Sequence, residues 1–305
     1  MPISFQSRTD LPARLVSLAQ HQDGAITSRQ TRPFLGPDQL TRAVNSGRLV
    51  RQWQGSYALA VSAGDLRTRL AAADLALGVP AVACTITAAE LHGFDLSGDP
   101  RLHLVAPGGC ASKSSQLVLH RDRILTPLVR VGERMAVAPA EAAVSVAARQ
   151  VDRPRALGVL DAALRTSATT KNALKDVAAL SRINNIRRVR ELIDWADPRA
   201  ESPPESWLRW VVLDAGLPSP TPQFSVRVGS GQCFRLDLAW PERRVACEYD
   251  GVTFHTGPRL FADRARMNAL RGAGWTVVFA TAPDLFALRD RLVIDLRNNL
   301  SHHAA

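Results

Sequence analysis

The chain has 305 residues, of which 46% are hydrophobic and 22% charged, a composition typical of a globular protein with two or three domains. No apolar run reaches the roughly 18–20 residues that a membrane span needs, and the first residues contain no apolar stretch like that of a secretory signal. The four cysteines (Cys84, Cys110, Cys233 and Cys247) lie far apart, which argues against a disulfide scaffold and against a zinc site. We therefore expect a cytoplasmic protein with reduced thiols and no membrane partner.

The formal net charge is +10, and the basic residues are 35 Arg and only three Lys. Residues 1–200 carry about +9 of this charge. Because the planar guanidinium binds phosphate through two hydrogen bonds, a basic front half indicates a polyanionic partner such as nucleic acid. A genome rich in G and C, which favours Arg codons whatever the function, explains the charge equally well.

Residues 1–61 show the pattern of three short helices followed by a hairpin. The sequence predicts helices at Asp10–His21, from Thr27 or Ser28 to about Leu35, and at Asp38–Val44, and strands at Arg48–Trp53 and Gly55–Leu59. This order is the plan of a winged helix-turn-helix domain.

Residues 62–200 indicate a mixed α/β middle domain. We expect helices at Leu66–Leu77, Thr87–His92, Ala138–Arg149 and Pro154–Ser167, and strands at Val79–Thr85, Arg101–Val105, Gln116–His120 and Leu128–Val131. The basic segment Arg182–Arg190 that follows is interpreted either as a second basic surface or as a solvated helix face. A stretch rich in Pro, Ser and Glu at Asp197–Pro204 predicts a linker to a third domain over residues 201–305.

The last hundred residues give the clearest pattern. The sequence predicts, in order, a helix at Pro204–Ala215, strands at Gln223–Val228, Cys233–Trp240 and Arg244–Asp250, a helix at Leu260–Arg271, a strand at Trp275–Thr281 and a helix at Pro283–Asn299. The order α-β-β-β-α-β is that of a restriction-endonuclease-like core. The fold class is therefore α/β of the α+β kind.

Acidic residues alternate along two neighbouring strands of this predicted core. Asp237 shares a face with Arg235 and Ala239, and Glu248 and Asp250 share a face of the next strand. A hairpin turn between the strands places Asp237 beside Glu248. Crowded carboxylates are the ligands that Mg²⁺ needs for metal-assisted phosphodiester hydrolysis. The alternative is a solvated strand face with incidental acids.

The surrounding residues resemble a domain of unknown function that groups with the very-short-patch-repair endonucleases. The resemblance covers about residues 201–288 and rests on Leu236-Asp237-Leu238-Ala239-Trp240-Pro241-Glu242, on Cys247-Glu248-Tyr249-Asp250-Gly251 with His255, and on Gly274-Trp275-Thr276-Val277-Val278. It implies a site of the PD-(D/E)XK type that binds Mg²⁺ or Mn²⁺, and its residues would be Asp237 as the central metal ligand, Glu248 as the second, Glu205 as the acid that completes the site, and His255 as a proton shuttle or phosphate contact.

Two questions stay open in this resemblance. Asp250 stands where many such sites carry lysine, so the site is either an active endonuclease or a silent copy of one. Asp263 and Arg266, three positions apart on a predicted helix, are either a surface ion pair or a pair with a role beside the site.

The front of the chain resembles AbiEi-type antitoxins. Residues 12–60, with Gln22-Asp23-Gly24-Ala25-Ile26-Thr27 and Ser46-Gly47-Arg48-Leu49-Val50-Arg51, are similar to their winged helix, and Thr87-Ala88-Ala89-Glu90-Leu91-His92-Gly93 is similar to the antitoxin-type domain that accompanies it. The resemblance implies that Asp38–Val44 is a recognition helix that offers Gln39, Thr41 and Arg42 to the major groove, and that Arg48 and Arg51 on the wing contact phosphates. A winged helix used for protein contacts is the alternative.

Our leading hypothesis from the sequence is a protein that binds double-stranded DNA and carries a Mg²⁺-dependent endonuclease-like domain, acting in phage defence or DNA processing. The alternative is an antitoxin-type transcriptional regulator with a silent nuclease fold and a cognate toxin as partner. A structural module that binds a toxin is a third hypothesis.

Overall fold

The computed structural model of the protein describes residues 11–96, 99–105, 115–121, 123–229, 231–251 and 258–302, with the backbone alone for 258–260 and 302. Its described residues form a mixed α/β structure of helices and several small sheets, and they divide into two compact units. One unit contains the described parts of Met1–Ala88, Gly98–Ile124 and Leu128–Val137, and the other contains those of Ala89–Ser97, Leu125–Pro127 and Ala138–Ala305. None of the described helices is long and apolar enough to cross a membrane.

The first unit begins with a small helical module closed by a sheet. Its elements are α1 (Ala13–Gln20), β1 (Ala25–Thr27), α2 (Ser28–Thr31), α3 (Pro37–Asn45), β2 (Leu49–Trp53) and β3 (Ser56–Leu59). The three predicted helices and the hairpin are present, and β1, which the sequence analysis missed, pairs with β3 so that the strand order is β1-β3-β2. The buried core lies between the helices and the sheet, and it consists of Leu15, Ala19, Ile26, Ala43, Leu49 and Leu59.

The turn before β1 brings the backbone close to a neighbouring side chain. Gly24 has φ +84°, and a Cβ placed on it would lie 2.3 Å from Oγ of Ser62 in the short 3₁₀ segment Ala60–Ser62. The hydroxyl of Thr68, in α4 (Leu66–Leu77), donates to the carbonyl of Asp23 at 2.6 Å. Glycine is therefore required here both for its backbone conformation and for its lack of a side chain.

The rest of the first unit is built from short strands. β4 (Leu102–Val105) and β5 (Leu117–His120) pair in parallel, and β6 (Val129–Val131) and β7 (Arg134–Ala136) form an antiparallel hairpin. The strand predicted at Val79–Thr85 is wrong. A single residue, Ala83, bridges to both pairs, and α5 (Thr85–Leu91) begins directly afterwards. Pro80 has no N–H to donate, which shortens any strand at this point.

The second unit contains four packed helices, α6 (Pro139–Arg149), α7 (Arg153–Arg165), α8 (Lys171–Leu180) and α9 (Ile186–Ile193). α6 and α7 are the helices predicted from the sequence, whereas α8 was not expected. Two arginines of α9 cap the C-terminal ends of other helices. Arg188 donates to the carbonyls at the end of α6, which are those of Ala147, Ala148 and Gln150. Arg190 donates to the carbonyls of Ala178 and Ser181 at the end of α8. Arg188 and Arg190 therefore bind to helix ends within the protein, and neither of the two interpretations of the Arg182–Arg190 segment, a basic surface or a solvated helix face, describes them.

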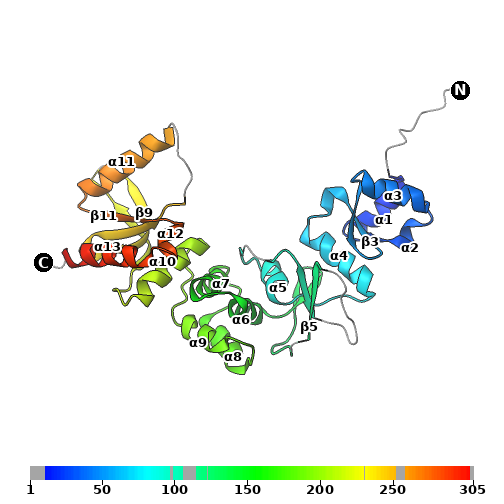
Figure 1. Ribbon diagram of the computed structural model, residues 1–305, viewed down its shortest axis with the longest axis horizontal. Coiled ribbons are helices and arrows are strands. Elements are labelled where there is room, and N and C mark those ends of the chain that lie inside the picture. The colour runs from blue at the N-terminus through cyan, green and yellow to red at the C-terminus, as the bar shows by residue number, and fades with distance from the viewer. Residues whose placement is uncertain are drawn as a thin grey trace. The chain divides into compact units, whose positions relative to one another are not determined.

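The C-terminal part contains α10 (Pro203–Asp214), β8 (Thr221–Arg227), β9 (Cys233–Trp240), a short 3₁₀ turn (Pro241–Arg243), β10 (Val245–Tyr249), α11 (Pro258–Gly272), β11 (Thr276–Ala280), α12 (Ala282–Leu285) and α13 (Arg289–His302). The sheet has the order β11-β10-β9-β8, with β10 and β11 parallel and the other pairs antiparallel. The predicted order α-β-β-β-α-β is present. Figure 1 shows α11 on one side of this sheet and α10 and α13 on the other.

Two predictions for this part need correction. The single helix predicted at Pro283–Asn299 is two helices, because the backbone leaves the helical region at Phe286, with φ −131° and ψ −72°. The predicted linker Asp197–Pro204 is tied to α7, since the backbone N–H of Asp197 donates to the buried carboxylate of Asp161 at 2.8 Å and Arg165 donates to the carbonyl of Ala200 at 2.7 Å. α7 and α10 consequently pack within one unit.

Candidate functional site

The hairpin of β9 and β10 brings two of the predicted site residues together. The register pairs Val245 with Trp240 and Cys247 with Leu238, so the next step along the strands sets Glu248 opposite Asp237. The backbone N–H of Tyr249 donates to Oδ2 of Asp237 at 3.0 Å. The antiparallel pairing predicted from the alternation of these strands is thus confirmed.

Glu205 reaches the same place from the first turn of α10. One of its carboxylate oxygens accepts hydrogen bonds from the backbone N–H of Glu201 at 2.8 Å and from the amide of Gln223 at 2.7 Å, and the other accepts from the hydroxyl of Ser202 at 2.8 Å. Gln223 lies in β8 with a φ of +53°, a left-handed conformation that is uncommon for this residue type. The Glu205 carboxylate is therefore held by three donors.

The titration of Asp237 is set by its burial and by the charges beside it. Its pKa is raised to about 6 from an ordinary value of 3.8. Burial is the largest cause and the negative charges of Glu205 and Glu248 act in the same direction, while the Tyr249 hydrogen bond and Arg266 act in the opposite one. Like charges in a partly buried place disfavour ionisation in this way. Glu205, Asp237 and Glu248 thus form one electrostatic group, named the carboxylate cluster below.

A cation of the chain itself lies in this cluster. Nη1 of Arg266, on α11, donates to Oε2 of Glu248 at 2.7 Å, and Nη2 donates to Oε1 of Glu248 and to the carbonyl of Arg235, the latter at 3.0 Å. Glu248 is only 7% exposed, so this two-bond ion pair is largely shielded from water. The hydrogen bonds from Arg266 to Glu248 also raise the pKa of the guanidinium. Arg266 thus contacts one of the predicted site acids, and the charge of Asp263 also raises its pKa.

The described arrangement does not fit a divalent cation. Both oxygens of Glu248 already accept from Arg266, and both oxygens of Glu205 accept from neighbouring donors. Within the part of the chain that the structure describes, no group of three or more His, Cys, Asp or Glu side chains is placed to hold a metal ion. Asp250 is exposed just beyond β10, where its N–H donates to Ala280, and His255 lies outside the described residues.

The predicted DNA-contacting residues of α3 lie on its exposed face. Gln39, Thr41 and Arg42 are exposed, whereas Ala43 is buried in the core. Gln39 also has a local role, since its side-chain Oε1 accepts from the backbone N–H of Gly36 at 2.8 Å and so caps the helix. The other two are engaged locally as well, since the Thr41 hydroxyl donates to the carbonyl of Pro37 at 3.0 Å and Nε of Arg42 donates to that of Asp38 at 3.3 Å. The helix therefore presents a polar face to solvent, and each of its three candidate residues is partly engaged within the helix.

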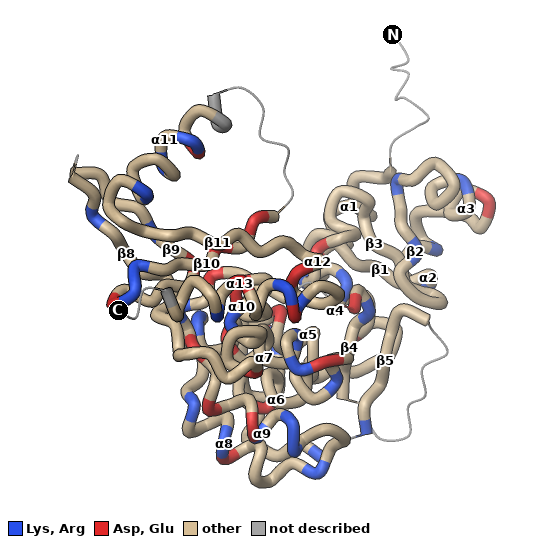
Figure 2. Tube along the Cα trace, turned by 60° about the vertical axis from the view of Figure 1, so that its left-hand side comes forward, with Lys and Arg blue, Asp and Glu red and all other residues tan. Residues whose placement is uncertain are grey.

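The two predicted wing arginines lie at β2, an edge strand of its sheet, and Figure 2 marks the basic residues of this region. Arg51 is exposed on β2. Arg48 directly precedes the strand, is half-buried, and donates from Nε to Oγ of Ser46 at 2.9 Å. Both side chains thus lie at the strand that the resemblance names as the wing.

A cluster in the first unit was not expected from the sequence. Nδ1 of His103 on β4 lies 2.9 Å from Nε2 of His120 on β5, and Nε2 of His103 lies 3.0 Å from Oδ2 of Asp99. The side-chain hydrogen bonds of Arg101 hold the pKa of Asp99 well below its usual range. The sequence offered one signal for this cluster, which is a histidine in each of two predicted strands. That the two rings lie side by side follows only from the pairing of β4 with β5.

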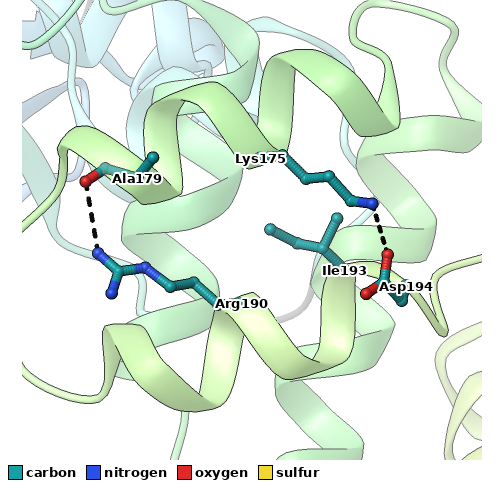
Figure 3. Close-up of a pocket in the computed structure, with 5 residues that line it drawn as sticks. All are labelled: Lys175, Ala179, Arg190, Ile193 and Asp194. Atoms are coloured by element: carbon teal, nitrogen blue, oxygen red, sulfur yellow. Dashed lines mark hydrogen bonds and ion pairs between the residues drawn. The ribbon is translucent and has the colours of Figure 1, made fainter.

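A pocket of about 550 Å³ lies between α8 and α9, lined by Lys175, Ala179, Arg190, Ile193 and Asp194. Figure 3 shows Lys175 and Asp194 pointing toward each other, with 2.6 Å between Nζ and Oδ1, and Arg190 directed at the end of α8. Its charged side chains are paired with other groups of the chain, so the pocket shows no feature that selects a ligand.

Comparison with known proteins adds two findings. The family described as the AbiEi antitoxin C-terminal domain matches residues 81–195. Two proteins of Mycobacterium tuberculosis, the uncharacterized protein MT2308 of strain CDC 1551 / Oshkosh and the uncharacterized protein Rv2248 of strain ATCC 25618 / H37Rv, are each 40% identical to this chain over 264 residues, which is 86% of this chain and 96% of each relative. The resemblance of the middle of the chain to an AbiEi-type antitoxin is thus confirmed.

Proposed function

This chain belongs to the family of the two mycobacterial proteins, and on that premise we propose that it is a DNA-binding regulator of the antitoxin type, with double-stranded DNA and a cognate toxin as partners. The observation that carries the proposal is the AbiEi antitoxin domain at residues 81–195, which follows the helical module of residues 13–59. Of the hypotheses drawn from the sequence, the regulator now takes precedence over the endonuclease.

The helical module supports DNA binding in this proposal as a winged helix. The order of three helices and an antiparallel hairpin, with α3 exposing polar side chains and β2 at a sheet edge, suits a helix that enters the major groove beside a wing on the backbone. Thr41 and Arg42 would face base edges, and Arg48 and Arg51 would contact phosphates. Phosphate contacts displace condensed counterions, so binding should weaken steeply as salt rises.

The test is a titration of duplex DNA from upstream of the protein's own gene, followed by fluorescence anisotropy at two salt concentrations. The double variant Arg48→Ala/Arg51→Ala should bind at least about tenfold more weakly than wild type, with a salt slope smaller by about two. The matched control Arg291→Ala/Arg297→Ala removes the same charge from exposed positions of α13 and should bind as wild type does. Equal losses in both variants would contradict docking through the wing.

A second function, metal-dependent cleavage of DNA, is favoured by one observation, the gathering of Glu205, Asp237 and Glu248. Cleavage would require a divalent ion bound by these acids. The ion pair between Arg266 and Glu248 competes with such an ion for Glu248. Purified protein incubated with duplex, mismatched and branched DNA in Mg²⁺ or Mn²⁺ tests it. Cleavage that EDTA stops and that Asp237→Ala abolishes would establish the endonuclease. If none of these substrates is cleaved, the regulator remains the proposed function.

A further inference from the structure

We propose that Arg266 is the built-in counter-ion of the carboxylate cluster, occupying the position at Glu248 that a divalent cation would need and so closing this domain to metal. The inference rests on the proposed regulator function, in which the nuclease-like core does no hydrolysis. It gives these acids a partner in a domain where, among the described residues, no group of ligand side chains is placed to hold a metal ion.

The geometry of the guanidinium carries this inference. Arg266 uses both terminal nitrogens on Glu248 and a further bond on the carbonyl of Arg235, so three acceptors fix its position. The guanidinium carbon also lies 5.9 Å from the centre of the Phe234 ring, within the range of a cation–π contact. A cation placed by so many contacts is ordered before any ligand arrives.

The charges around the guanidinium support the same conclusion. The cluster contributes three carboxylates, and Arg266 is the cation whose charge lowers the pKa of Asp237. Arg235, the neighbouring arginine on β9, instead pairs with Glu201 at 2.6 Å. The position of Arg266 therefore matches the place where the negative charge is concentrated.

Competition with an ion in solution then favours the arginine. To reach Glu248, Mn²⁺ or Mg²⁺ must lose water molecules and leave a guanidinium without its carboxylate partner in a partly buried place. The side chain of Arg266 needs no such step, because it is part of the chain and is already oriented. Removing the guanidinium should consequently leave Glu248 free to bind a divalent cation beside Asp237.

The experiment is calorimetric titration of the full chain with MnCl₂ near neutral pH. Wild type should show no binding in the low millimolar range, and Arg266→Ala should bind Mn²⁺ at least tenfold more tightly than wild type. Adding Asp237→Asn to Arg266→Ala should remove the gain. Arg264→Ala, which removes an exposed arginine from the same helix, should behave as wild type.

The variant Arg266→Gln covers the case in which Arg266→Ala does not fold, because the neutral amide can still donate to Glu248. Wild type that binds Mn²⁺ as tightly as the Arg266 variants overturns the inference, as does a folded Arg266 variant that binds none. DNA binding of the same variants, measured by anisotropy, reports separately on the regulator: a lack of duplex binding in wild type would overturn the proposed function while leaving the metal result unaffected.

Discussion

Asp161 of α7 and Arg209 of α10 form an ion pair, with 2.5 Å between Oδ2 and Nη2, in which the carboxylate is fully buried and the arginine side chain is 5% exposed. Arg209 also donates to the carbonyl of Trp195, and the N–H of Asp197 donates to the other oxygen of Asp161. The pair joins α7, which lies in the AbiEi antitoxin domain, to α10, the first helix of the C-terminal part.

The first prediction concerns this pair. Arg209→Met leaves Asp161 buried without its cation and should lower the free energy of unfolding by about 3–5 kcal/mol, as measured by urea denaturation. Arg153→Ala breaks the exposed pair of Arg153 and Glu191, where 2.6 Å separates Nη2 and Oε2, and should cost less than about 1 kcal/mol. Similar losses in both variants would show that burial of the α7–α10 pair has no special role.

The second prediction concerns the arginine that closes α6. Arg188→Ala removes the donor to the carbonyl of Gln150 at the end of α6 and should lower the free energy of unfolding by about 1–3 kcal/mol. The carbonyl of Ala148 keeps its bond from Asn185, and that of Ala147 keeps its bond from the N–H of Gln150. Arg187→Ala removes a neighbouring arginine that is exposed, and it is the matched control. A thermal or chemical melt in which the two variants match would contradict the capping role.

The third prediction follows from the raised pKa of Asp237. The folded protein binds a proton at this carboxyl more tightly than the unfolded chain does, so the stability it contributes is present below pH 4 and is lost as the pH rises through about 6. Asp237→Asn is neutral at every pH and keeps an acceptor for the N–H of Tyr249. Its stability relative to wild type should therefore increase by up to about 3 kcal/mol between pH 4 and pH 7. Urea denaturation across this range measures it, with Asp290→Asn as the control for loss of one exposed carboxylate; a constant difference would contradict the shift.

The fourth prediction compares two glycines with left-handed backbones. Gly47 has φ +70° and open space where a Cβ would lie, with no atom within 4 Å, whereas Gly24 has φ +84° and Ser62 at 2.3 Å. Gly47→Ala should cost about 1 kcal/mol for the backbone alone, and Gly24→Ala about 1–2 kcal/mol more for the added contact. The double variant Gly24→Ala/Ser62→Ala should recover part of that difference, as followed by urea denaturation. If it recovers none, the contact with Ser62 is not the cause.

The sequence predicted elements that depend on neighbours in the chain. The alternation along Cys233–Trp240 and Val245–Tyr249, with a Pro-containing turn between, was enough to place Asp237 opposite Glu248. The α8 helix was missed although the sequence carries its signal, with Thr170 as N-cap and apolar residues at helical spacing. The contact by which Arg190 closes α8 from α9 could not be predicted. A contact between two elements that are distant in the chain produces no periodic pattern of residues from which it could be predicted.

The partner of Arg266 shows the same limit at the candidate site. Spacing along a helix relates Arg266 to Asp263, and the surface pair followed from that spacing. The contact with Glu248 depends on α11 covering one side of the sheet that contains β10, which only the folded structure establishes. The acids of the site could be named from the sequence, but the ion pair of Arg266 with Glu248 could not.

The cap on α3 bears on the bases that this helix would contact in the proposed complex with DNA. Because the carbonyl oxygen of Gln39 already accepts from the N–H of Gly36, the NH₂ group is the more available part of its amide. The paired donor and acceptor bonds by which glutamine selects adenine would then be weakened, and the side chain would favour edges that offer acceptors, such as guanine O6 and N7 or thymine O4. If α3 enters the major groove as proposed, the operator should lack a fixed adenine at the position under Gln39, and releasing the cap should allow adenine there.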